Sequence, residues 1–142
     1  MAGAVLYSPQ VLALATGLAD YPFDQSAALH GEARSPTCGS SIKLSLAVDD
    51  AGAVSKVGLA AHACAIGQAS AMVFAEGAAG RTSDEIAAAE LEIANWLTGG
   101  SLPDWPGFAA LEPARAYPAR HGAIRLPWKA ALAALSSRGS GG

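Results

Sequence analysis

The sequence has few cysteines and few basic residues, and each scarcity excludes a class of protein. Its 142 residues include only two cysteines, Cys38 and Cys64, which are too few for a disulfide-stabilised secreted scaffold. Lysine and arginine together number nine against twelve acidic residues, the net charge is −3, and no dense basic cluster occurs. Because a nucleic-acid-binding protein neutralises phosphates with clustered cations, we expect no nucleic-acid partner.

Long apolar runs are also missing. The chain is 51% hydrophobic with a mean hydropathy of +0.28, yet no stretch supplies the ~20 strongly apolar residues that a membrane-spanning helix needs. The apolar segment 2–18 lacks a basic start, and its Ser8 and Pro9 are typical of a helix cap and first turn rather than of a signal peptide. We therefore expect a cytoplasmic protein with no membrane partner, in which both cysteines are thiols.

The residue patterns that are present predict one α+β domain. Alternation of apolar residues and turn signals predict three strands, over about 27–34, 42–48 and 54–61. Helical spacing and caps predict four helices, over 8–18, 66–79, 82–97 and from Ile124 or Pro127 to about Leu135. We expect a small antiparallel three-stranded β-sheet packed against several α-helices, as a single domain over residues 1–135 with a flexible tail over 136–142.

The two cysteines lie in loops at either end of the predicted hairpin. Cys38 lies between Pro36 and Gly39 just before a strand, and Cys64 lies where the second hairpin strand gives way to a helix. Unpaired N–H groups at the helix start favour a thiolate at Cys64. Because a hairpin returns the chain to its start, the two thiols can meet and form part of a zinc or iron–sulfur site. This spacing leaves two alternatives open for the cysteines. They are two small buried hydrophobic residues, or they form a dithiol redox pair.

Three short motifs of the sequence together resemble a known family. They are Pro36-Thr37-Cys38-Gly39, then Ala63-Cys64-Ala65-Ile66-Gly67-Gln68-Ala69-Ser70, and a C-terminal block that runs from Phe108 through Tyr117-Pro118-Ala119-Arg120 to Leu126-Pro127-Trp128. In this order they resemble the U-type iron–sulfur cluster assembly scaffolds (NifU, IscU and SufU), and the SufU-like branch most closely. The second motif is similar to the family's Gly-Cys-x-Ile-Ser-x-Ala-Ser. The resemblance covers nearly the whole chain and implies the family's α+β fold.

The resemblance also implies a metal site, of which this sequence keeps a part. The family's first motif continues as Cys-Gly-Asp, whose aspartate binds zinc or assists cluster release, and that place is Ser40 here. A third family cysteine, in Arg-x-x-Cys-x-x-Leu-x-Trp, corresponds to Ala123. A serine hydroxyl is a poor substitute for a carboxylate, and alanine is no ligand. The ligands that carry over are therefore Cys38 and Cys64.

Two histidines lie close to these motifs in the sequence. His62 precedes Cys64 by two residues, and His121 precedes the lost third cysteine by two. Imidazole binds zinc and some clusters, so both histidines are candidate metal ligands beside the cysteines. Residues two apart on a strand share a face, which places His62 on the same face as Cys64. The alternative for each histidine is a solvent-exposed ring. A glutathione thiol, a water or a partner's cysteine could also complete the shell. Arg120 and Arg125 flank the site and either raise its positive potential or are ordinary surface arginines.

The sequence leaves three functions open, none of them enzymatic. The first is a scaffold or carrier that accepts sulfur and iron, or a preformed iron–sulfur cluster, at Cys38 and Cys64 and passes it to apo iron–sulfur proteins; such a cluster would be labile or bridged in a homodimer. The second is a metal-free module that binds or regulates a cysteine desulfurase. The third is a zinc-binding sulfur-transfer protein, which needs His62 or His121 as a ligand. No Ser-His-Asp order, phosphate-binding glycine loop or paired buried carboxylates indicates a small-molecule enzyme.

Overall fold

The computed structural model describes residues 8–36 and 39–140, with side chains to residue 136. Its sheet consists of β1 (Leu29–Arg34), β2 (Ser41–Val48) and β3 (Val54–His62). Its α-helices are α2 (Pro9–Thr16), α3 (Ala65–Ala78), α4 (Ser83–Leu97) and α5 (His121–Ser140). Short 3-10 helices fill the connections as η1 (Gly17–Asp20), η2 (Phe108–Ala116) and η3 (Pro118–Arg120). Cys38 lies outside the described residues.

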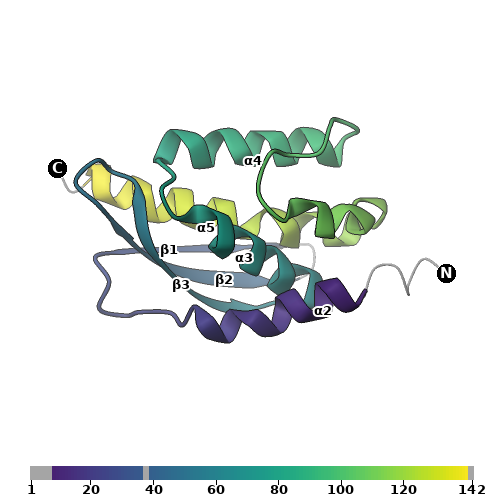
Figure 1. Cartoon of the computed structure of the whole chain (residues 1–142), viewed down its shortest axis with the longest axis horizontal. Helices are drawn as coiled ribbons and strands as arrows, with labels where there is room; N and C mark the ends of the chain where they lie inside the picture. The colour runs from purple at the N-terminus through teal and green to yellow at the C-terminus, as the bar shows by residue number, and fades with distance from the viewer. Residues whose placement is uncertain (1–7, 37–38, 141–142) are drawn as a thin grey trace.

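The three strands form an antiparallel sheet in the order β1-β2-β3, with one face covered by helices. The central strand β2 alternates as predicted, because Ile42, Leu44 and Leu46 are fully buried whereas Lys43 is exposed. In Figure 1, α3 and α5 lie over the sheet and α4 lies farthest from it, on the other side of α5. The predicted α+β architecture is confirmed.

The contact between β1 and α5 depends on a glycine. A Cβ on Gly31 would overlap the backbone carbonyl of Ala130 and lie 2.6 Å from the backbone nitrogen of Ala134. Only a residue without a side chain lets the strand and the helix approach this closely. The approach fixes α5 across β1 and β2, and so fixes where the N-terminal end of α5 meets the rest of the molecule.

An aromatic cluster fills the space between the helices. Phe74, Trp96, Trp105, Phe108 and Trp128 are all buried, and the centroids of their contacting rings lie 5.0 to 5.8 Å apart, mostly edge to face. Such pairs add to the stabilisation from apolar burial. The indole N–H of Trp105 donates to a backbone carbonyl of α3 over 2.9 Å. The connection between α4 and α5, rich in proline, is thereby held against α3.

The last helix begins earlier and continues further than the sequence predicts. α5 starts at His121 rather than at Ile124 or Pro127, and it runs past Leu135 to Ser140, so the expected tail is helical as far as the structure describes it. A proline inside a helix removes a backbone hydrogen bond, which is why Pro127 suggested a first turn. Burial of Pro127 and of its neighbours in the core offsets that loss.

Among the described residues, no helix combines the length and the apolar character that crossing a membrane requires.

Candidate functional site

A pocket at the end of β3 unites the three sequence motifs. Its volume is about 440 Å³. The residues that line it are Gly39, Ser40, Ala61, His62, Ala63, Cys64, Gln68 and Arg120. Residues 39 and 40 come from the first motif, 63, 64 and 68 from the second, and 120 from the C-terminal block. Segments that are far apart in the sequence therefore meet at one place, as the hairpin argument predicts for the two loops.

Cys64 lies at the N-terminus of α3, where the sequence places it. It is the N-cap residue of the helix, with extended backbone angles and no side-chain capping hydrogen bond. Its free thiol is half-buried, and its carbonyl accepts the backbone N–H of Gln68 over 2.9 Å. The thiol is therefore at the start of the helix and is not used to cap it.

The loop before β2 places the neighbours of Cys38 at the same pocket. The backbone N–H of Ser35 donates to the carbonyl of Ser40 over 2.8 Å, and that of Gly39 donates to the carbonyl of Ser35 over 2.9 Å. Gly39 has a φ of 72°, which favours glycine. Cys38 itself lies outside the described residues, so its convergence with Cys64 stays a prediction, supported by the place of Gly39 and Ser40 in the pocket wall.

The two positions where the family carries further ligands are both buried here. Ser40 lines the pocket and is 4% exposed. Ala123 is fully buried beside the second motif, since a Cβ added to Gly67 would lie 3.4 Å from the Ala123 methyl and 2.7 Å from the Ala63 methyl. The Ala123 methyl thus packs behind the pocket wall and supplies no donor atom.

The three histidines lie in different surroundings. His62 is exposed and lines the pocket beside Cys64. The Nε2 atom of His121 lies 2.7 Å from a backbone carbonyl oxygen of η2, and this residue is not part of the pocket lining. His30 packs on Phe23 at a ring distance of 5.1 Å and does not line this pocket. Of the two candidate histidines, the structure brings His62 to Cys64 and gives His121 a backbone partner.

The two arginines of the C-terminal block have separate roles. Arg120 lines the pocket, whereas Arg125 pairs with Glu90 at 2.6 Å and joins α5 to α4. Gln68 is a pocket residue that the sequence analysis did not single out, although its spacing of four from Cys64 signals a shared helix face. Its side-chain amide donates to the Ala63 carbonyl over 2.9 Å.

The described residues offer only part of a metal shell. Within residues 8–36 and 39–136, no three His, Cys, Asp or Glu side chains are grouped so that they could hold a metal ion. Cys64 and His62 are the two soft or borderline donors in the pocket. Because tetrahedral zinc takes four ligands, these two need Cys38 and a further donor from elsewhere.

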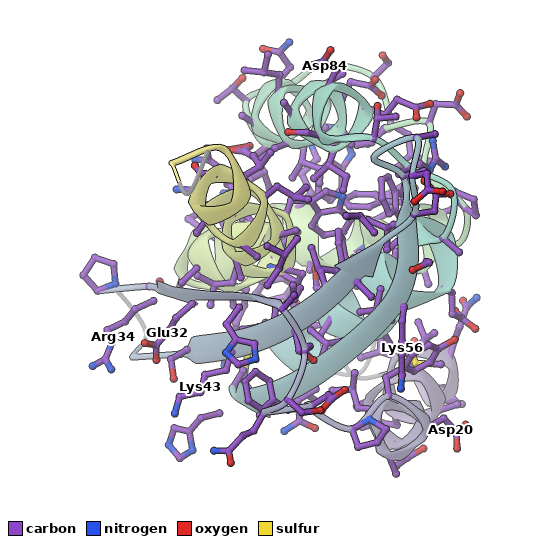
Figure 2. All side chains as sticks on the ribbon, turned by 90° about the vertical axis from the view of Figure 1, so that its left-hand side faces the viewer. Asp20, Glu32, Arg34, Lys43, Lys56 and Asp84 are labelled. Carbon is purple, nitrogen blue, oxygen red and sulfur yellow. The ribbon has the colours of Figure 1, made fainter. Side chains whose placement is uncertain are left out.

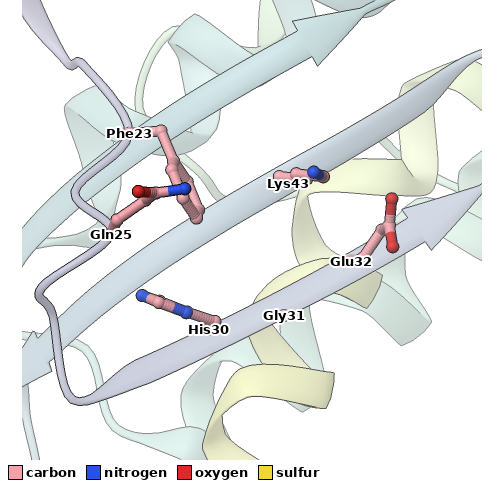
Figure 3. A pocket seen from close by; sticks show the side chains of 6 residues that line it. All are labelled: Phe23, Gln25, His30, Gly31, Glu32 and Lys43. Carbon is pink, nitrogen blue, oxygen red and sulfur yellow. The ribbon is translucent and has the colours of Figure 1, made fainter.

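A second pocket lies on the face of the sheet that the helices leave uncovered. It has a volume of about 470 Å³ and is lined by Phe23, Gln25, His30, Gly31, Glu32 and Lys43, shown in Figure 3. Figure 2 shows the neighbouring charged side chains of β1 and β2, among them Arg34, pointing away from the helices. None of these residues belongs to the three motifs, so the second pocket is not the predicted site.

Comparison with known proteins supports the family resemblance and the fold. A family model described as the NifU-like N-terminal domain matches residues 19–113. The crystal structure of a nitrogen-fixing NifU-like protein (N-terminal) from Brucella abortus is 26% identical, with a TM-score of 0.87 and 100% of both chains covered. A protein from Fervidobacterium islandicum AW-1, described as an iron–sulfur cluster assembly scaffold for the SUF system, is 24% identical, with a TM-score of 0.82 over 93% of this chain and 98% of that chain. The comparison with curated proteins gives no match.

Proposed function

The chain belongs to the NifU-like N-terminal domain family, and from this premise we propose that it is a scaffold or carrier that holds an iron–sulfur cluster through Cys38 and Cys64. The family is one of scaffolds and not of enzymes. The observation that carries the proposal is the single pocket to which all three motifs contribute, with the Cys64 thiol at its wall.

The chemistry of such a carrier is thiolate ligation. Iron and sulfide are its cargo, and the protein contributes anionic sulfur donors that are held near each other. Cys64 presents one of these donors at the N-terminus of α3, on the wall of the pocket. Because Ser40 and Ala123 provide no thiolate or carboxylate, a bound cluster is labile or is shared with a second copy of the chain. A labile cluster suits transfer to an apo iron–sulfur protein.

Anaerobic reconstitution with iron and sulfide tests this proposal. The expected result is visible thiolate-to-iron absorption that disappears in Cys38→Ser and in Cys64→Ser. His62→Gln shows whether the pocket histidine contributes, and His30→Gln is its matched control, because His30 packs on Phe23 away from the pocket. A colourless product with no bound iron, from wild-type protein that is still folded, would refute the proposal.

A zinc-binding sulfur-transfer protein is the second candidate, and the position of His62 beside Cys64 favours it. In that case Cys38, Cys64 and one histidine would hold zinc, with a fourth ligand from solvent or a partner. His121 would have to use its Nδ1 atom, since Nε2 faces a carbonyl oxygen. Elemental analysis of protein purified without added metal decides this case, because one zinc per chain is its requirement.

A metal-free module that binds a cysteine desulfurase is the third candidate, favoured by the burial of Ser40 and Ala123 without donor chemistry. In this case the partner is a cytoplasmic desulfurase, and neither Cys38 nor Cys64 is needed to bind it. A pull-down of the desulfurase that is unchanged in the Cys38→Ser/Cys64→Ser variant would support this candidate. Loss of the partner in that variant would reject it.

A further inference from the structure

The outer edge of β1 is an unpaired edge of the sheet. The strand order is β1-β2-β3, and the outer edge of β3 is covered: the N–H of Leu59 donates to the carbonyl of Tyr21 over 2.8 Å, beside a parallel bridge between Pro22 and Leu59. Within residues 8–36 and 39–140, no segment pairs in this way with the outer edge of β1. Such an edge presents backbone donors and acceptors on which a further strand can form.

The hydrogen bonds at the end of β1 show which of its residues direct their backbone groups to the open edge. The N–H of Ser35 donates to the carbonyl of Ser40 over 2.8 Å, which extends the antiparallel register of β1 and β2 by one step. Backbone groups alternate in direction along a strand, so the odd-numbered residues of β1 face β2. The N–H and carbonyl groups of His30, Glu32 and Arg34 therefore face the open edge.

Two exposed side chains of opposite charge lie along this edge. Glu32 and Arg34 point away from the helices, and among the described residues neither takes part in an ion pair. Directly opposite side chains of paired strands lie on the same face, where opposite charges stabilise the pair. An added antiparallel strand would complete both ion pairs with an acidic residue opposite Arg34 and, two positions later, a basic residue opposite Glu32.

The position of α5 decides what kind of strand fits this edge. A Cβ on Gly31 would overlap the backbone of α5 at Ala130, so the helix lies directly over β1. A second copy of the chain would bring its own α5 beside the first. Paired strands lie about 4.7–4.9 Å apart, whereas packed helices need about 8–10 Å between their axes, so two copies would collide. An extended segment without a covering helix, and with small residues on the α5 side, avoids this collision.

We propose that the outer edge of β1 binds an extended segment of a partner protein as an added antiparallel strand. The segment carries an acidic residue, a small residue and a basic residue in that order. The acidic residue lies opposite Arg34 and the basic residue opposite Glu32, and each pair exchanges backbone hydrogen bonds. Neither Glu32 nor Arg34 lines the pocket at Cys64, so this inference does not rest on the proposed function.

Fluorescence anisotropy with a labelled, end-capped peptide, Thr-Ser-Glu-Ala-Arg-Ser-Thr, tests the backbone pairing. Because one short strand buries little area, we expect saturable binding with a Kd of about 0.1–1 mM. In the proposed pairing, the N–H of the peptide arginine faces β1 and that of the peptide alanine faces solvent. N-methylation of the arginine is therefore expected to abolish binding, and N-methylation of the alanine to preserve it. Binding that does not saturate, or equal effects of the two methyl groups, would overturn the proposal.

Charge variants test the side-chain pairing. Arg34→Glu makes both charged positions of the edge acidic, so it is expected to weaken binding of this peptide about fivefold and to favour a peptide with arginine at both charged positions. Lys43→Glu is the matched control, because it changes the net charge equally on the neighbouring strand and on the same face. Thermal unfolding of both variants verifies their fold. An equal loss of binding in the two variants would overturn the assignment to this edge.

Sedimentation equilibrium tests the choice of partner. The free protein is expected to sediment as one chain of 14.2 kDa at the concentrations used for peptide binding. A dimer that Arg34→Glu dissociates would show that a second copy occupies the edge, and would overturn the proposal.

Discussion

Gly67 and Ala63 fit each other at the back of the site, and this fit predicts a strong coupling between them. A Cβ at position 67 would lie 2.7 Å from the Ala63 methyl, closer than real Cβ contacts, and 3.4 Å from the Ala123 methyl. Gly67 is fully enclosed in the first turns of α3, so an added methyl group cannot turn toward solvent. The family motif has glycine where this chain has Ala63 and serine where it has Gly67. Each departure from that motif makes room for the other.

The magnitude follows from two opposed effects in Gly67→Ala. Overpacking of a core position costs about 1–3 kcal/mol of unfolding free energy. Replacing glycine by alanine inside a helix returns about 1 kcal/mol. We expect a net loss of up to about 2 kcal/mol, which lowers the melting temperature by about 2–4 °C for each kcal/mol lost. Without the overlap, the same substitution would stabilise the protein. A destabilised Gly67→Ala therefore supports the overlap, and a stabilised one contradicts it.

A double-mutant cycle isolates the contact. Ala63→Gly alone removes one half-buried methyl group and costs about 0.8 kcal/mol. Ala63→Gly/Gly67→Ala removes the overlap and is expected to unfold within about 1 kcal/mol of the wild type, with a coupling energy above about 1 kcal/mol. Urea unfolding of the four proteins supplies the values. Additive effects, or a stabilised Gly67→Ala, would show that the two positions do not share this space.

Three further predictions concern other parts of the molecule. Ser40→Asp/Ala123→Cys places a carboxylate and a thiol at the two buried positions beside the pocket and is expected to tighten zinc binding at least tenfold, measured by competition with a chromogenic chelator. Hydrogen bonds that the backbone N–H and the hydroxyl of Thr82 donate to the Glu85 carboxylate lower the pKa of Glu85 below its usual 4.5. The stability that Glu85 adds is therefore present above that pH and is lost as the pH falls through the lowered pKa, so the free energy of unfolding of Glu85→Ala in urea should approach that of the wild type only in acid. Arg125→Ala leaves the Glu90 carboxylate half-buried without its cation and should cost about 1–3 kcal/mol in thermal unfolding, whereas Glu90→Gln/Arg125→Met should cost less.

The sequence predicts those elements whose signals are local. The alternation of Ile42, Leu44 and Leu46 defines β2, and the cap predicted at the start of α4 is a capping box of Thr82 and Glu85. The start of α5 is not predictable in this way, because the local signal of Pro127 is opposed by burial in a core that residues far along the chain build. The contact between the backbone carbonyl of Arg115 and His121 is not predictable from local signals either, because only the folded connection between α4 and α5 brings the two residues together.

Local sequence signals likewise predict one part of the candidate site and not the other. The motifs identify Cys64 and Ser40 as neighbours in a site, and the helix-start argument places Cys64 at an N-terminus, which the structure confirms. Local sequence does not decide which histidine lies beside Cys64, because both His62 and His121 lie two residues from a motif position. The register of β3 brings His62 into the pocket, whereas the turn before α5 directs His121 to a backbone carbonyl. The burial of Ala123 is likewise a result of packing between α3 and α5.

The electrostatics of the proposed site depend on the two lost ligands. A metal centre with four anionic protein donors repels further anions, and a nearby cation then serves to balance the donors. Two of those donors are replaced here by the neutral side chains of Ser40 and Ala123, so Cys38 and Cys64 remain as the anionic donors of the proposed site. A carboxylate at position 40 would add a third anionic donor, so we expect Ser40→Asp alone to tighten zinc binding severalfold in competition with a chromogenic chelator, and an unchanged affinity would contradict this account.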